Sequence, residues 1–271
     1  MKNKRDYLKI LFVFIFFLQF NFVLSDEFEF KAATIKTSNK GDLIEGFGGV
    51  EINDSTDLTL TGEEFRYDKL DALLSIKGNV LITDKFNINF IKSKKITFNK
   101  KLNIINISDK AVIELDGGYL IESYNVTYDR NLDLFFSNNK TIVTDSFENK
   151  FYMDTFSYSI IDKVLVAENF EIMDVEKNIY KVKSVRYNLK TNEIIGKDLS
   201  LNFNSENIRS GQNEPRLKGN AFFYKKNTTQ ISKGVFTTCK KNDNCPPWVL
   251  SAEKIEHNKV KKRINYKNAL L

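Results

Sequence analysis

A unit of about 30 residues recurs seven times along the chain and constrains its fold more than any other feature of the sequence. Each unit contains one anchor residue, aromatic in six units and histidine in the last. The anchors are Tyr67, Phe98, Tyr128, Tyr158, Tyr187, Tyr224 and His257. Their spacings of 31, 30, 30, 29, 37 and 33 residues are nearly constant, and such periodicity predicts stacked copies of one supersecondary unit.

The residue after each anchor is polar and predicts a turn. Asp and Asn are favoured there because their side chains hydrogen-bond to nearby backbone amides. These residues are Asp68, Asn99, Asp129, Ser159, Asn188, Lys225 and Asn258.

Apolar columns keep the same register as the anchors. The positions two before and seven after the anchor are apolar in all seven units, and the position fourteen after is apolar in six. The first two columns are Phe65, Ile96, Val126, Phe156, Val185, Phe222 and Ile255, then Leu74, Ile105, Phe135, Leu165, Ile194, Ile231 and Ile264. Side chains alternate along a strand, so the anchor and the residue two before it share one face.

No unit can bury these columns alone, whereas stacked units align them into one apolar interior. With 23 Phe, 11 Tyr and only 3 Pro, the composition favours strands over helices. The sequence therefore predicts an all-β protein, an elongated open β-jellyroll or solenoid-like stack of strand–turn–strand repeats. Polar segments at about 205–215 and 240–247 interrupt the register and predict irregular loops.

The first 25 residues have the layout of a secretory signal peptide. Four basic residues precede an apolar run from Ile10 to Leu24, and Val23 and Ser25 place small residues before a cleavage site. A transmembrane anchor is the alternative, although the run is short for a span. Removing residues 1–25 leaves 37 basic and 34 acidic residues in the mature domain, 26–271. This balance and the scattered lysines argue against a nucleic-acid partner.

The sequence contains no recognisable catalytic motif, and we expect neither an enzyme nor a cofactor. The single histidine, His257, occupies the anchor column and is interpreted as structural. Cys239 and Cys245 are the only cysteines, and in an oxidising compartment a local disulfide is expected. Free or intermolecular thiols are the alternatives. A metal site is disfavoured because further ligands are lacking.

The C-terminal part of the chain resembles a known family. The segments 234–239 (GVFTTC), 245–255 (CPPWVLSAEKI) and 266–269 (YKNA) are similar to the end of the periplasmic domain of the LptD (OstA) lipopolysaccharide-assembly family. The repeat itself resembles the OstA-like domain that LptA, LptC and LptD share. The resemblance covers about residues 28–271 and is strongest from Gly234 onwards.

This resemblance implies a non-enzymatic role in lipopolysaccharide transport at the periplasmic face of the outer membrane. A β-jellyroll interior would shield acyl chains, and the N-terminal strands would pair with an LptA-like bridge by β-strand addition. Family members continue into an outer-membrane barrel, which works with an LptE-like lipoprotein. Because no barrel strands follow here, a truncated sequence, a separately encoded barrel and a soluble LptA-type bridge remain open as explanations.

Another reading is a secreted β-solenoid that acts as a spacer or adhesin and has a filled core. Apolar columns do not distinguish a filled core from a lipid trough, because both place Ile, Leu and Phe inward. Under the transport hypothesis, the candidates for lining the lipid-facing interior are Phe65, Phe98, Tyr128, Phe135, Tyr158 and Leu165. Ordinary core packing is the alternative for each of them.

Overall fold

The computed structural model describes residues 28–55, 58–84, 88–115, 117–173, 177–204, 213–240, 248–258, 260–261 and 263–271. The predicted signal peptide lies outside these residues, as do residues 205–212 and 241–247 of the two predicted loops. One helical turn, the 3-10 turn Asn39–Gly41, occurs in the described chain. No helix in those ranges is long and apolar enough to cross a membrane.

Strands make up most of the described chain, and the predicted all-β class is confirmed. The strands are β1 (Glu29–Ser38), β2 (Leu43–Asn53), β3 (Leu58–Asp68), β4 (Leu73–Asp84), β5 (Ile88–Asn99), β6 (Ile104–Leu115), β7 (Tyr119–Asp129), β8 (Leu134–Ser137), β9 (Thr141–Thr144), β10 (Lys150–Met153), β11 (Thr155–Ser159), β12 (Val164–Met173), β13 (Ile179–Asn188), β14 (Glu193–Asn202), β15 (Arg216–Lys225), β16 (Thr228–Thr237), β17 (Leu250–Asn258) and β18 (Arg263–Leu270).

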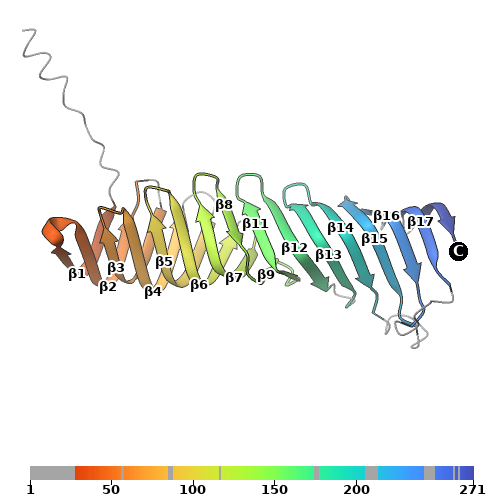
Figure 1. Ribbon diagram of the computed structural model, residues 1–271, viewed down its shortest axis with the longest axis horizontal. Helices are drawn as coiled ribbons and strands as arrows, with labels where there is room; N and C mark the ends of the chain where they lie inside the picture. Colours follow the sequence, from red (N-terminus) through yellow and green to blue (C-terminus); the bar gives the residue numbers. More distant parts are fainter. Residues whose placement is uncertain are drawn as a thin grey trace, which may run out of the picture.

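Neighbouring strands pair antiparallel, so the sheet grows by one hairpin per repeat along a single long axis (Figure 1). Two strand levels in the middle are split. β8 and β9 both pair with β7, and β10 and β11 both pair with β12. Across this split, β8 pairs with β11 and β9 with β10. In the described chain β1 pairs only with β2 and β18 only with β17, so the sheet has an open edge at each end.

The predicted turns follow the anchors. Asp129 Oδ1 accepts hydrogen bonds from the backbone amides of Asn131 (2.9 Å) and Leu132 (3.3 Å), and Asp68 and Asn188 make equivalent pairs. Lys225 is the exception, because a two-residue turn follows it. Both of its residues, Lys226 and Asn227, have positive φ (46° and 66°), as a tight type I′ hairpin requires.

Successive anchors are joined by direct cross-strand pairing into one row. Up to Tyr187, the residue seven after each anchor lies opposite that anchor and also opposite the next one, as Leu74 does between Tyr67 and Phe98. After Tyr224 a shorter turn puts Thr229 in this place, and Ile231 pairs with Phe222 and Ile255 instead. The row runs Ile44, Tyr67, Leu74, Phe98, Ile105, Tyr128, Phe135, Tyr158, Leu165, Tyr187, Ile194, Tyr224, Thr229, His257 and Ile264. The anchors and the residues opposite them therefore form one continuous line of side chains, which we call the anchor row.

Many strands bend near the middle, where β-bulges interrupt the pairing. In β2, for example, Gly48 and Gly49 have φ of 82° and 86° and the register with β3 shifts around them. A bulge bends its strand, and the inward-facing residues on either side of the bend then line two facing surfaces. We call the half of each strand that contains the anchor row the anchor arm, and the other half the far arm.

The two arms pack against each other at the β1 end. Phe30 in the far arm stacks on Phe65 in the anchor arm, with ring centroids 4.6 Å apart. Phe28 makes edge contacts with Tyr67 (5.3 Å) and Phe98 (5.5 Å). Each far-arm residue here meets an anchor arm further along the chain. The interior is therefore the space between two slanted arms.

Candidate functional site

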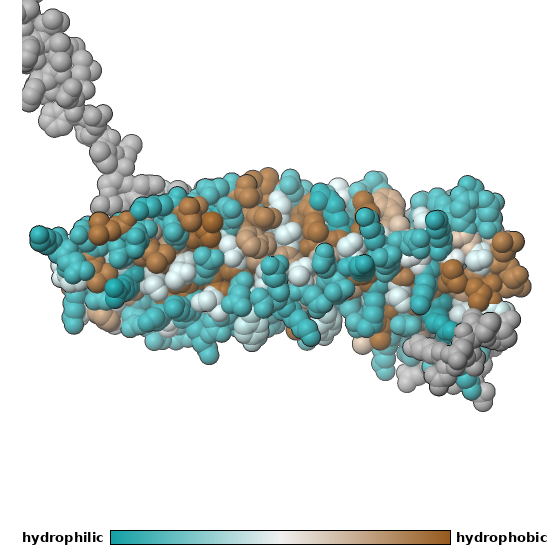
Figure 2. Space-filling model, viewed as in Figure 1, coloured by the Kyte–Doolittle hydropathy of each residue, from teal (hydrophilic) through white to brown (hydrophobic). Residues whose placement is uncertain are grey.

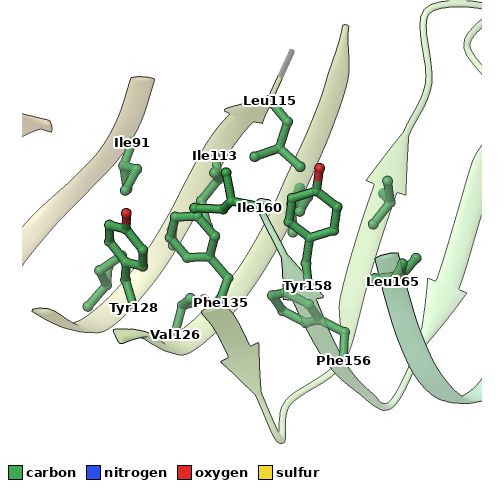
Figure 3. Close-up of a cluster of buried hydrophobic side chains, with 14 of the residues drawn as sticks. Ile91, Ile113, Leu115, Val126, Tyr128, Phe135, Phe156, Tyr158, Ile160 and Leu165 are labelled. Atoms are coloured by element: carbon green, nitrogen blue, oxygen red, sulfur yellow. The ribbon is translucent and has the colours of Figure 1, made fainter. Parts of the chain in front are cut away.

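The six residues predicted to line a lipid-facing interior all lie in a part of the core that is filled. Phe65, Phe98, Tyr128, Phe135, Tyr158 and Leu165 belong to one buried cluster, and none is more than 6% exposed. The rings of Tyr128 and Phe135 stack with centroids 4.3 Å apart, and neighbouring side chains close around them (Figure 3).

Little free volume remains among these residues. A cavity lined by Tyr158 and Leu165 measures about 20 Å³, room for about one water molecule. We call the interior from β3 to β11, with the adjoining end of β12, the closed part. Its geometry fits core packing, and contact of these six residues with lipid stays a prediction.

A buried group of charges links the two arms at the edge of the closed part that lies next to the anchor-arm turns. Asp54, at the far-arm end of β2, has a fully buried side chain. Arg130 Nη1 lies 2.8 Å from Asp54 Oδ2, and Lys100 Nζ pairs with Asp54 Oδ1. Lys100 and Arg130 belong to anchor-arm turns, and their side chains are 13% and 9% exposed. We call these three residues the clasp.

The basic members of the clasp also cover aromatic rings. Lys100 Nζ lies 5.2 Å from the centre of the Phe28 ring, and the Arg130 guanidinium lies 5.4 Å from that of Phe98. Cation–π contacts of this kind are stronger when water is excluded. The clasp thus joins the two arms at this edge through both ion pairs and ring contacts.

Tyr128 makes the closed part sensitive to alkali. Burial raises the pKa of Tyr128, and the negative charge of Asp133 acts in the same direction. Since the folded pKa exceeds the unfolded one, the resulting stabilisation is complete below about pH 10 and is lost as pH rises further. We expect the urea midpoint, followed by circular dichroism, to fall above about pH 10. The fall should be shallower in Tyr128→Phe, and equal slopes would contradict this assignment.

An open apolar cavity of about 810 Å³ lies between the arms at the β18 end, and we call it the trough. At this end Figure 2 shows apolar residues gathered at the surface. None of the residues that line the trough is Lys, Arg, Asp or Glu. They are Phe170, Ile172, Asn178, Tyr180, Val182, Ile194, Leu199, Leu201, Phe203, Leu217, Phe222, Tyr224, Thr229, Ile231, Phe236, Ile255, His257, Ile264 and Tyr266.

Glycines in the strands that form the trough let neighbouring side chains pack directly over the backbone. A Cβ on Gly219 would lie 2.3 Å from Ile231 Cγ2, and one on Gly234 would lie 2.4 Å from Ile255 Cδ1. Ala252 lies opposite Gly234 across the β16–β17 pair. Gly62 takes the same place in the closed part, where an added Cβ would lie 2.6 Å from Ile76 Cγ2. The apolar columns of the two parts are alike, and they contain no signal that distinguishes the trough from the closed part.

The floor of the trough at its far-arm end is aromatic. The Phe236 ring contacts Phe203 (6.2 Å between centroids) and Trp248 (5.9 Å). Thr237 Oγ1 donates to the Trp248 carbonyl oxygen at 2.9 Å and accepts from the Cys239 amide at 3.2 Å. The segment with the strongest family resemblance therefore helps to build the trough.

Cys239 is buried, and no disulfide joins it to another residue in the described part of the chain. Cys245 lies outside the described residues, so the predicted Cys239–Cys245 disulfide stays a prediction. Across the ranges that the structure describes, no group of three or more His, Cys, Asp or Glu side chains is placed to hold a metal ion.

A scan of the chain against protein-family models finds no match, and a search of curated proteins finds none either. The resemblance to the LptD (OstA) family therefore depends on the sequence motifs quoted above.

Proposed function

We propose that this protein is a non-enzymatic carrier that shields the acyl chains of lipopolysaccharide during transport at the periplasmic face of the outer membrane. The observation that supports this proposal is the trough, an apolar space of about 810 Å³ with no charged lining residue. Burying an acyl chain requires only such a surface, and each methylene removed from water contributes roughly 0.8 kcal/mol.

The dimensions of the trough suit an acyl chain. Its lining comes from strands between β12 and β18, which are six inter-strand steps apart, or roughly 29 Å. One leaflet of a bilayer has a hydrocarbon thickness of about 15 Å. A chain lying along the trough therefore fits within its length.

The open sheet edges suit the partners that the family resemblance suggests. An LptA-like bridge would add a strand at β1, since an edge strand offers unpaired backbone groups. An outer-membrane barrel with an LptE-like lipoprotein would follow the β18 end. A soluble LptA-type bridge would use the same two edges.

The second candidate function is a spacer with no affinity for lipid. The filled core of the closed part favours it for that part of the chain, because packed side chains leave no room for a ligand. The trough distinguishes the two proposals, since a spacer has no use for an open apolar space.

Photo-crosslinking at adjacent aromatic residues tests the proposal. Phe222 lines the trough, whereas Phe223 does not and lies on the opposite face of β15. A photoreactive amino acid at each position would be irradiated in cells that make lipopolysaccharide. We expect lipopolysaccharide adducts from Phe222 and none from Phe223. An exported, folded protein without adducts at Phe222 or Tyr224 would favour the spacer.

Phe135 provides a further crosslinking position in the same experiment. It lies in the closed part and is fully buried, so we expect no adduct there. An adduct at Phe135 would instead show that the arms separate during transport and admit acyl chains to the closed part.

A further inference from the structure

The anchor row changes character where it borders the trough. Between Tyr67 and Leu165 its members are aromatic or aliphatic, whereas Thr229 and His257 interrupt it with polar side chains. Both residues line the trough. The change falls next to the turns, at the outer margin of the anchor arm.

Thr229 and His257 lie directly opposite each other in the β16–β17 pair. Cβ atoms of residues opposite each other in an antiparallel pair are about 4.5–5.5 Å apart, so the two side chains stand side by side. Within the described chain neither side chain makes a hydrogen bond to another residue. The threonine hydroxyl and an imidazole N–H are therefore available to donate to a ligand.

Deeper positions on the same strands are apolar. Two residues inward from Thr229 is Ile231, and two residues inward from His257 is Ile255, and these two also pair directly. The trough therefore has hydrogen-bond donors at its margin and hydrocarbon at depth. A ligand that matches this order has an acceptor at one end of an apolar chain.

The lining also restricts the charge of that acceptor. Because no Lys or Arg lines the trough, a fully ionised group held inside would lose hydration without gaining a cationic partner. An ester or amide carbonyl is a neutral acceptor and needs only the donors that are present.

We propose that Thr229 and His257 recognise the carbonyl of the ester or amide linkage by which an acyl chain is attached, with the chain inserted towards Ile231 and Ile255. This inference rests on the proposed function and adds the chemical group that the trough selects. The sugar or other polar part of the ligand stays outside the margin.

Two detergents with the same chain length test this inference on the purified mature protein. Sucrose monolaurate has an ester carbonyl, whereas dodecyl maltoside has a disaccharide head and no carbonyl. Calorimetric titration below the micellar concentration should show tighter binding of the ester. In Thr229→Val and in His257→Phe we expect about a fivefold loss for the ester, the factor that a typical net hydrogen bond provides. Binding of dodecyl maltoside should be unchanged.

Two further variants serve as controls. Thr228→Val alters the neighbouring threonine, which does not line the trough, and should leave both affinities unchanged. His257→Gln keeps a donor and should retain most of the affinity for the ester. An equal loss for both detergents in Thr229→Val and His257→Phe would overturn carbonyl recognition while leaving the trough as an acyl-chain site. Failure of the wild-type protein to bind either detergent would overturn the proposed function itself.

Discussion

Replacing Asp54 with alanine should lower the free energy of unfolding by about 3–5 kcal/mol, because it leaves the buried charges of Lys100 and Arg130 without their counter-ion. Removing one partner of a buried ion pair costs more than the pair contributes, since the remaining charge stays out of water. Urea unfolding followed by circular dichroism would measure the loss.

An exposed ion pair supplies the control for this experiment. Lys31 Nζ lies 2.9 Å from Glu51 Oε1, and both side chains are largely exposed. Glu51→Gln should leave the unfolding midpoint almost unchanged, because solvent screens such pairs. If Asp54→Ala shifts the midpoint no more than Glu51→Gln does, the clasp does not stabilise the closed part. Fluorescence of Trp248, recorded in parallel, reports on the trough end separately.

Alanine substitutions at Gly46 and Gly196 should differ in their cost, although both place a Cβ 2.1 Å from the Cε1 atom of a phenylalanine. At Gly46 the ring is that of Phe65, which is buried and stacked on Phe30. Overpacking of such a site costs about 1–3 kcal/mol. At Gly196 the ring is that of Phe222, and the added Cβ would also lie 2.8 Å from Val182 Cγ1, but both side chains border the open trough.

Urea midpoints of the two variants would test this difference. We expect the larger loss of stability in Gly46→Ala. In Gly196→Ala we expect the displaced Phe222 ring to occupy part of the trough and weaken binding of sucrose monolaurate. Equal destabilisation by the two substitutions, with detergent binding unchanged, would contradict the distinction between a closed part and an open trough.

The repeat was predictable because the residues of each unit specify its turn and the inward face of its strands locally. An anchor such as Tyr128 is followed by the turn residue Asp129, and seven residues later by Phe135 on the same face. Local hydrogen bonding and strand alternation suffice to derive this pattern. Direct pairing of each anchor with the residue seven after it follows once the turn length is known.

The third apolar column could not be placed in the same way. Leu201, fourteen residues after its anchor, faces inward, whereas Leu81 does not and its neighbour Ile82 is buried instead. The bulge between the residue seven after the anchor and the third-column residue is longer in β4 than in β14. Bulge length changes which side chains face inward, and an apolar pattern alone does not reveal it.

The candidate site was missed for a related reason. The six predicted residues face the interior, as Phe222 and Ile231 do, but they lie where the far arm is filled. Whether the interior is filled or open depends on the opposite arm, and the apolar columns do not place that arm. The offset between the arms joins residues far apart in sequence, such as Asp54 and Arg130, and no local pattern encodes that offset.

The anchor row also sets how the length of the protein depends on its number of repeat units. Because each unit from Tyr67 to Tyr187 enters and leaves the row in the same register, duplicating one of them inserts two strand levels and lengthens the molecule by about 10 Å. The edge at β1, the clasp and the trough keep their own residues when a unit is added between them. Reach and ligand recognition are therefore separate properties of this chain, and selection can alter one without redesigning the other.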